Sequence, residues 1–375
     1  MKKHLISLPQ NGLCNRLAHA STSKLFAEQM GWDFSLAWET LNLFVDSPYK
    51  VSAIRDLNPH ETLFLFTHFS HGPGDSYPLT GDMNGDSIQL FLNYGCYDLS
   101  LEDAEKYFNN LGFKLSELEI DEGNKRVFTK NHSFTEIKEF FNAHSTIVLQ
   151  GWGFSKSLYG PTGLNTHSIE ELNREKKDFY GTLPLNNSLS QLTSPYIENF
   201  FKGKSVVGIQ ARFGDRTWLY NAAAEPEQLP DSLSPEDLQV WCDQVDRLGR
   251  EYDHIFICSD STWVCDYFSQ RYPHCFSFRH SFQRDVGSTG CYWNDIEAND
   301  LINFHPPTNL TEQNTGNCKK TMCKEDFAAW NLLTQCNKIL FSDGSSYGYE
   351  ASVAGGVGDS REIPPNLTQN FPLKF

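Results

Sequence analysis

Ser205-Val-Val-Gly-Ile-Gln-Ala-Arg-Phe-Gly-Asp215 is the stretch of the chain that decides its fold. Its short apolar run predicts one buried strand, and Arg212 stands at the end of that run. Ligands of open α/β sheets bind beyond the carboxyl ends of the strands, where a planar guanidinium can grip a phosphate through two parallel hydrogen bonds. The segment therefore predicts a nucleotide or nucleotide-sugar site, with a salt bridge from Arg212 to Asp215 as the structural alternative.

Composition is typical of a two-domain globular protein. The 375 residues exceed the usual size of a single core, and 39% of them are hydrophobic, enough to fill two cores. A net charge of −16 disfavours a nucleic-acid or anionic-membrane partner, because phosphate groups attract basic surfaces. No window approaches the roughly 20 apolar residues of a membrane span, and no signal sequence is evident, so we expect a cytoplasmic protein without an integral membrane segment.

Cysteine spacing argues against a bound metal. The ten cysteines show no paired CxxC spacing, which indicates free thiols in a reducing compartment. A zinc site built from Cys318 and Cys323, with Cys291 or Cys336, would have unusual spacing and no paired histidines. A phosphate-binding Gly-x-x-x-x-Gly-Lys-Ser/Thr loop is also missing from the sequence, which disfavours a kinase.

Strand and helix patterns alternate along both halves of the chain. In the first half we expect strands at 4–8, 33–38, 62–67 and 145–150, and helices at 16–30, 101–112 and 134–143. The sequence between about 160 and 200 is polar and turn-rich, which indicates an interdomain crossing. We therefore expect an N-terminal α/β domain over residues 1–190 and a C-terminal Rossmann-like domain over residues 200–375.

Polar side chains follow three predicted strands of the second half, at 205–211, 254–258 and 338–342. They are Arg212, Asp215, Ser259, Asp260, Ser345 and Ser346. Because the carboxyl ends of parallel strands share one edge of a sheet, we expect these side chains to converge. The two late serines also begin a predicted helix, whose N-terminal N–H groups favour phosphate, while simple N-capping is the structural alternative.

Five motifs follow one another in an order typical of a known group. They are Gly12-Leu-Cys-Asn-Arg16, the aromatic stretch Leu149 to Tyr159, Gln210 to Asp215, Phe256 to Ser261, and Glu325 to Ser352. Together they resemble the fucosyltransferase-like superfamily of inverting GT-B glycosyltransferases, which includes bacterial α-1,2-, α-1,6- and protein O-fucosyltransferases. The resemblance implies an α/β, GT-B-like fold in which two Rossmann-like domains face each other across a cleft, the acceptor on the N-terminal side and the donor on the C-terminal side.

A GDP-sugar donor, usually GDP-fucose, and a glycan acceptor are the partners that the resemblance implies. Arg212 is implied to hold the β-phosphate as it leaves, and the loop from Gly12 is implied to bring Asn15 and Arg16 near the sugar. The implied donor-binding residues are Gly12, Gln210, Asp215, Ser259, Asp260, Ser345, Ser346 and Tyr347. Members of the family commonly carry a histidine where this chain has Gln210. Because of this difference, the identity of the donor sugar and the rate of catalysis are left open.

An inverting transfer needs an in-line acceptor hydroxyl, an acceptor for its proton and stabilisation of the departing diphosphate. The sequence has no Asp-x-Asp pair to hold a divalent ion, so we expect the arginines to replace the metal electrostatically, with no metal and no cofactor. Candidates for the base lie in the loop from His68 to Asp75 and at Glu39, where solvated loop groups are the alternative. The residues assigned to the acceptor side are Glu39, His68, His71, Trp152 and Phe154. Asp75 is assigned as a catalytic residue.

The two aromatic residues of that set, Trp152 and Phe154, are candidates for a sugar-stacking wall, with domain packing as the alternative. The function expected from the sequence is metal-independent, inverting transfer of fucose from GDP-fucose to a glycan hydroxyl. A non-catalytic nucleotide- or glycan-binding protein with the same fold is the second hypothesis, and Gln210 is its sequence signal. The acceptor, the linkage and the oligomeric state are left open by the sequence.

Overall fold

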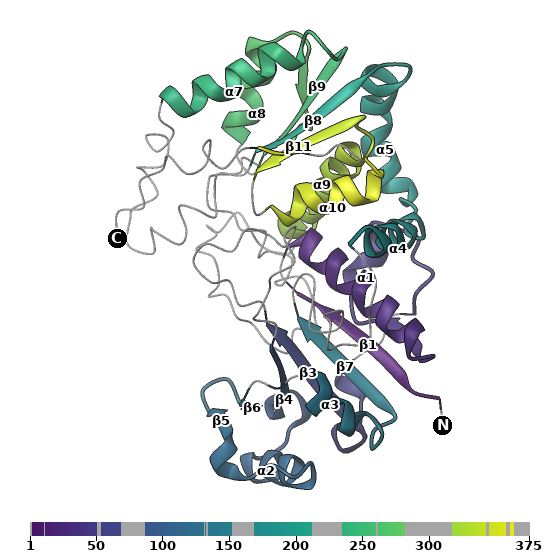
Figure 1. Ribbon diagram of the computed structural model, residues 1–375, viewed down its shortest axis with the longest axis vertical. Coiled ribbons are helices and arrows are strands. Elements are labelled where there is room, and N and C mark those ends of the chain that lie inside the picture. The colour runs from purple at the N-terminus through teal and green to yellow at the C-terminus, as the bar shows by residue number, and fades with distance from the viewer. Residues whose placement is uncertain are drawn as a thin grey trace. The chain divides into compact units, whose positions relative to one another are not determined.

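The computed structural model shows two compact α/β units, each with its own sheet (Figure 1). The residues it describes are 2–10, 12–50, 54–68, 87–130, 132, 134–151, 169–211, 235–259, 262–281, 317–342, 345–357 and 361–363. Among these residues, the first unit holds everything up to Pro184 except Leu43–Val45. The second unit holds Leu43–Val45 and everything from Leu185 onward.

The first unit is built on a seven-stranded mixed sheet in the order β2-β1-β7-β3-β4-β6-β5. Its parallel half consists of β2 (Asp33–Leu36), β1 (His4–Pro9), β7 (Thr146–Gly151) and β3 (Thr62–His68). Its antiparallel half consists of β4 (Ser87–Asn93), β6 (Arg126–Thr129) and β5 (Leu118–Asp121). The four strands predicted in the first half are the four parallel ones, and these predictions are confirmed.

Helix α1 (Leu13–Gln29) connects β1 to the parallel strand β2, so the three elements form a βαβ unit. It ends in a Schellman motif, in which Gly31 adopts a φ of +64° and donates its N–H to the carbonyl of Glu28 at 3.0 Å. The N–H of Trp32 donates to the carbonyl of Ala27 at 2.8 Å. The left-handed conformation at Gly31 turns the chain back toward the sheet, where β2 begins.

Other helical segments of the N-terminal part of the chain cover the sheet or connect its strands. The helices are α2 (Leu101–Asn110), α3 (Phe134–Phe141) and α4 (Ile169–Gly181). The short 3-10 segments are η1 (Glu39–Leu43), η2 (Ile54–Asp56), η3 (Pro59–Glu61), η4 (Tyr94–Tyr97) and η5 (Leu115–Glu117). The helices predicted at 101–112 and 134–143 correspond to α2 and α3 and are confirmed.

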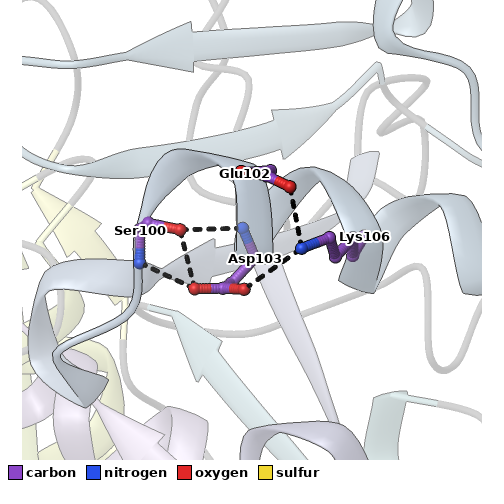
Figure 2. Close-up of polar contacts among 4 residues, drawn as sticks. All are labelled: Ser100, Glu102, Asp103 and Lys106. Atoms are coloured by element: carbon purple, nitrogen blue, oxygen red, sulfur yellow. Dashed lines mark hydrogen bonds and ion pairs between the residues drawn. The ribbon is translucent and has the colours of Figure 1, made fainter.

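Helix α2 begins with a capping box, drawn in Figure 2. The Ser100 hydroxyl accepts the N–H of Asp103 at 3.1 Å, and the Asp103 carboxylate accepts the N–H of Ser100 at 3.2 Å. Lys106 pairs with Glu102 at 2.9 Å on the exposed side of the same turn. Reciprocal hydrogen bonds at Ser100 therefore set the residue at which α2 begins.

The second unit is built on a five-stranded sheet in the order β10-β9-β8-β11-β12, and every pairing in it is parallel. The strands are β10 (Cys275–Ser277), β9 (His254–Ser259), β8 (Val206–Ala211), β11 (Lys338–Ser342) and β12 (Arg361–Ile363). The helical segments are α5 (Asn187–Tyr196), the π-helix η7 (Ile197–Phe201), α7 (Pro235–Leu248), α8 (Thr262–Arg271), α9 (Asn317–Thr334) and α10 (Ser346–Gly355). The three strands predicted in the second half are β8, β9 and β11.

Central strand β8 is covered on both faces, which explains why its sequence is almost entirely apolar, with Gln210 as the exception. Val207, Ile209 and Ala211 belong to the core that includes side chains of α7 and α8. On the other face, a Cβ added to Gly208 would lie 2.5 Å from Leu333 Cδ1 in α9. Glycine at this position therefore lets α9 approach the sheet closely. Figure 1 shows α7 and α8 on one side of the sheet and α9 and α10 on the other.

The division between the two units, at Pro184 and Leu185, falls within the segment between about 160 and 200 that was predicted as the interdomain crossing. The described part of that segment contains the helices α4 and α5, so the turn-rich structure expected there is wrong. Helix α4 has Leu172, Phe179 and Tyr180 buried at helical spacing within an otherwise charged sequence. Helix α5 starts at the N-cap Asn186, whose side chain accepts the N–H of Leu189 at 3.0 Å. Charged and polar residues on the exposed faces of these helices made the segment look like a loop.

Candidate functional site

Parallel pairing brings the ends of three strands to one edge of the second unit's sheet. Ala211, the last residue of β8, is in register with Ser259, the last residue of β9. Gln210 is in register with Phe341, the residue before the end of β11. This edge is where ligands of open α/β sheets bind. The expectation that the three strand ends share one edge is thus met by the sheet topology.

Helix α10 starts at the same edge, directly after β11. Its N-cap is Ser345, which is almost fully buried and accepts the N–H of Gly348 at 3.4 Å. A Cβ added to Gly348 would lie 2.1 Å from Phe341 Cβ and 3.2 Å from Gln210 Oε1. The first turn of α10 is therefore pressed onto the ends of β11 and β8, and only glycine leaves room for that approach. Ser346 is the first helical residue and is buried.

A second set of contacts at α10 involves Tyr347 and the turn of α9 that contains Glu325 and Asp326. The Tyr347 hydroxyl donates to the backbone carbonyl of Asp326 at 2.8 Å. Glu325 Oε1 accepts the N–H of Ser281 at 2.9 Å, and Glu325 Oε2 lies 3.6 Å from His280 Nδ1. Burial alone would raise the pKa of Glu325, but hydrogen bonds from His280 and Ser281 outweigh it and lower that pKa, which favours the ionised carboxylate.

Sequence reasoning did not identify Glu325, Asp326 or His280. The only local signal is a pair of consecutive acids flanked by apolar residues on one helix, since Met322, Cys323 and Phe327 are all buried beside them. Glu350 is a further buried acid, fully covered within α10. Buried carboxylates of this kind need hydrogen-bond partners, and for Glu325 those partners come from a distant segment of the chain.

The loop after β1 carries a second group of predicted residues, all in the first unit. Gly12 is the N-cap of α1, in an extended conformation. Arg16 is 2% exposed, and its Nη1 donates to the carbonyl of Pro9 at 2.6 Å. Its guanidinium carbon lies 5.8 Å from the ring centroid of Trp38. Arg16 is thus held against the strand it follows, while Asn15 beside it is partly exposed.

His19 lies one turn further along α1 and is 1% exposed. Its Nδ1 is 3.0 Å from the hydroxyl of Ser7 in β1. Burial, and then the nearby charge of Arg16, lower the pKa of His19 from 6.5 to about 3. The imidazole is therefore neutral at physiological pH, which is the form that a buried site next to a guanidinium requires.

The remaining predicted residues divide into two groups. Arg212, Asp215, Asp260, Asp75, His71, Trp152 and Phe154 lie outside the described residues. Glu39 is the first residue of η1 and His68 the last residue of β3. Within the described part of the chain, Gln210, Ser259, Ser345, Ser346 and Tyr347 all belong to the second unit, whereas Gly12, Asn15 and Arg16 belong to the first. Their roles toward a donor or acceptor stay predictions.

Neither a membrane-spanning helix nor a metal-binding cluster of side chains occurs among the described residues. None of the helices in that part of the chain has the length and apolar character needed to cross a membrane. Likewise, no three His, Cys, Asp or Glu side chains among the described residues gather in a way that could hold a metal ion. Cys336 is buried and carries a free thiol.

Comparison with known proteins gives a match only at the level of structure. No protein-family model matches the chain, and no curated protein sequence matches it. A mutant of FUT1 from Arabidopsis thaliana, in complex with GDP, is 11% identical, matches over 98% of this chain and 72% of that chain, and has a TM-score of 0.50. The fucosyltransferase NodZ from Bradyrhizobium is 13% identical over 94% of this chain and 91% of its own, with a TM-score of 0.45.

A third solved structure, POFUT1 in complex with GDP-fucose, is 8% identical over 96% of both chains, with a TM-score of 0.45. At these identities the likeness concerns the fold. The match to FUT1 confirms the α/β, GT-B-like fold class predicted from the sequence.

Proposed function

We propose that this chain is an inverting, metal-independent glycosyltransferase that moves fucose from GDP-fucose to a hydroxyl of a glycan. The observation that supports it most is the common carboxyl edge of β8, β9 and β11, with the start of α10 beside it, in a fold shared with FUT1. Nucleotide ligands of doubly wound α/β folds bind at such an edge. The FUT1 structure to which this chain is similar is a complex with GDP.

Chemically, the proposed reaction is a single displacement. The acceptor oxygen attacks the anomeric carbon from the face opposite the diphosphate, the bond from that carbon to the β-phosphate oxygen breaks, and the acceptor proton passes to a base. Arg212, which follows Ala211 in the sequence, is proposed to neutralise the departing diphosphate. Glu39 and the loop from His68 to Asp75 supply the candidates for the base, and Asn15 and Arg16 are proposed to lie near the sugar.

Helix α10 is proposed to help bind the diphosphate through the N–H groups of its first turn. Support for this comes from the contacts of Gly348 with β11 and Gln210, which hold that turn at the carboxyl edge. Ser259, at the end of β9 and in register with Ala211, is proposed to approach the nucleoside together with Asp260. A reducing, cytoplasmic compartment is part of the proposal and is supported by the absence of paired CxxC spacing in the sequence.

Nucleotide selectivity tests the proposal first. A ligand present at a hundred times its dissociation constant stabilises the folded state by about 2.7 kcal/mol, so GDP should raise the unfolding temperature while UDP, ADP and CMP should not. Arg212→Ala removes one charge-assisted contact, about 1.5–3 kcal/mol, and should lower turnover of GDP-fucose roughly ten- to a hundredfold. Arg247→Ala is the control, because Arg247, in the last turn of α7, is half exposed and pairs with Glu251.

A non-catalytic binding protein is the second candidate, favoured by Gln210. This glutamine occupies the position at which the resembled family commonly has histidine, and it is buried beneath the first turn of α10. Measurement of GDP release from GDP-fucose distinguishes the two hypotheses. GDP-selective binding without release of GDP from GDP-fucose, across a panel of glycan acceptors, would favour the binding protein, and absence of any nucleotide binding would refute both.

A further inference from the structure

The hydroxyl of Tyr347 is already committed within the second unit. It donates its single proton to the carbonyl oxygen of Asp326 at 2.8 Å, which is a normal hydrogen-bond length. A tyrosine hydroxyl has one proton to give, and phosphate oxygens near neutral pH act chiefly as acceptors. While this bond is made, the hydroxyl of Tyr347 cannot also donate to a phosphate.

Asp326 is well suited to act as an anchor because its turn of α9 is itself fixed. The neighbouring carboxylate of Glu325 accepts the N–H of Ser281, 44 residues earlier in the chain, and faces His280 Nδ1 at 3.6 Å. The side chains of Glu325 and His280 are each only 5% exposed. A buried, ionised carboxylate held by two partners resists displacement, because moving it would leave a charge unpaired.

The first turn of α10 is thus held from two sides. Gly348 packs onto Phe341 and Gln210 at the sheet, and Tyr347 bonds to α9. Ser345 caps the same turn through Gly348. Three positions, Ser345, Tyr347 and Gly348, therefore fix where the N–H groups of the first turn point. Small displacements of groups that bind a reacting ligand reduce binding and rate.

We propose that Tyr347 is a positioning residue of the donor site: its hydroxyl fixes the first turn of α10 through Asp326 and does not itself bind the diphosphate. The inference rests on the proposed function, because it takes the diphosphate of a GDP-sugar to bind at that turn. It replaces the direct contact between Tyr347 and the donor that the sequence resemblance implies. The hydroxyl of Tyr347 supplies the tether.

Tyr347→Phe tests this proposal, because the substitution removes only the hydroxyl. In the ligand-free protein, amide hydrogen exchange in the first turn of α10 should become faster. The dissociation constant for GDP should rise about two- to tenfold, the range for one neutral hydrogen bond, while that for guanosine, which has no phosphate, should stay unchanged. Tyr252→Phe is the control, since Tyr252 precedes β9 at the opposite end of the sheet and should change neither measurement.

Each outcome decides the question. Weaker GDP binding with unchanged exchange in the free protein would mean that the hydroxyl contacts the ligand directly, which overturns the positioning role. Faster exchange with unchanged GDP affinity would leave a purely structural tether and also overturns it. Equal weakening for GDP and guanosine would refute the link to the diphosphate. Failure of the wild-type protein to bind GDP refutes the proposed function itself and this inference with it, and the wild-type measurement distinguishes that case.

Discussion

His19 should make the stability of the first unit strongly dependent on pH. The imidazole is completely buried on α1, contacts Ser7 and lies near the charge of Arg16. Burial first, and Arg16 second, lower its pKa from 6.5 to about 3. Between these two values the unfolded chain binds a proton at position 19 and the folded chain does not.

The sign of the effect follows from this difference in bound protons. Stability from a depressed histidine pKa is fully present above pH 6.5 and falls as the pH drops, because protons then favour the unfolded state. At pH 5, which is 1.5 units below 6.5, the loss amounts to about 2 kcal/mol at 1.36 kcal/mol per unit. The decline should continue toward pH 3, where the folded form also binds the proton.

Urea unfolding at pH 7 and at pH 5, followed by far-ultraviolet circular dichroism, measures this loss. His19→Gln keeps a neutral hydrogen-bonding side chain near Ser7 and should remove about 2 kcal/mol of the difference between the two pH values. His60→Gln, at an exposed position, should leave the difference as it is in the wild type. Equal pH dependence in wild type and His19→Gln would refute the argument, because carboxylates that titrate in both proteins cancel in the comparison.

Two further predictions concern local structure. Ser100→Ala removes the capping box of α2 and should lower the free energy of unfolding by about 1 kcal/mol in urea denaturation. Lys106→Ala removes exposed ion pairs with Glu102 and Asp103 but leaves the capping hydrogen bonds in place, so its effect should be clearly smaller. Equal effects of the two substitutions would contradict the capping argument. Gly348→Ala would place a Cβ 2.1 Å from Phe341 Cβ and should destabilise the protein by about 1–3 kcal/mol in thermal unfolding. Gly181→Ala meets nothing within 4 Å and should be nearly neutral, so comparable losses for the two glycines would refute the packing argument.

Most parallel strands could be predicted from the sequence because each is a short apolar run between polar turns. The runs at 4–8, 254–258 and 338–342 all appear as β1, β9 and β11. Burial on both faces demands such runs, so the local sequence carries the information. The antiparallel strands β4, β5 and β6 were not predicted. Strand β4 pairs with β3 and β6, which are distant from it in the sequence, and β5 is partly exposed.

The same distinction applies to the candidate site. Gln210, Ser259 and Ser345 could be identified from sequence because one rule about the carboxyl ends of parallel strands selects them. The contacts of Glu325 with Ser281 and of Tyr347 with Asp326 span 44 and 21 residues, and no local pattern reveals them. Sequence therefore predicts which edge of the sheet binds a ligand, whereas the structure shows how the helix at that edge is held.

Both units fix the start of a helix by contacts to the strand before it. In the first, Arg16 of α1 donates to Pro9, the last residue of β1. In the second, Gly348 of α10 packs onto Phe341 near the end of β11. Each contact holds the first turn of its helix against the strand that precedes it. Preorganised donors bind a developing or departing negative charge without the cost of reorientation, so we expect Gly348→Ala to weaken binding of the proposed diphosphate at the first turn of α10.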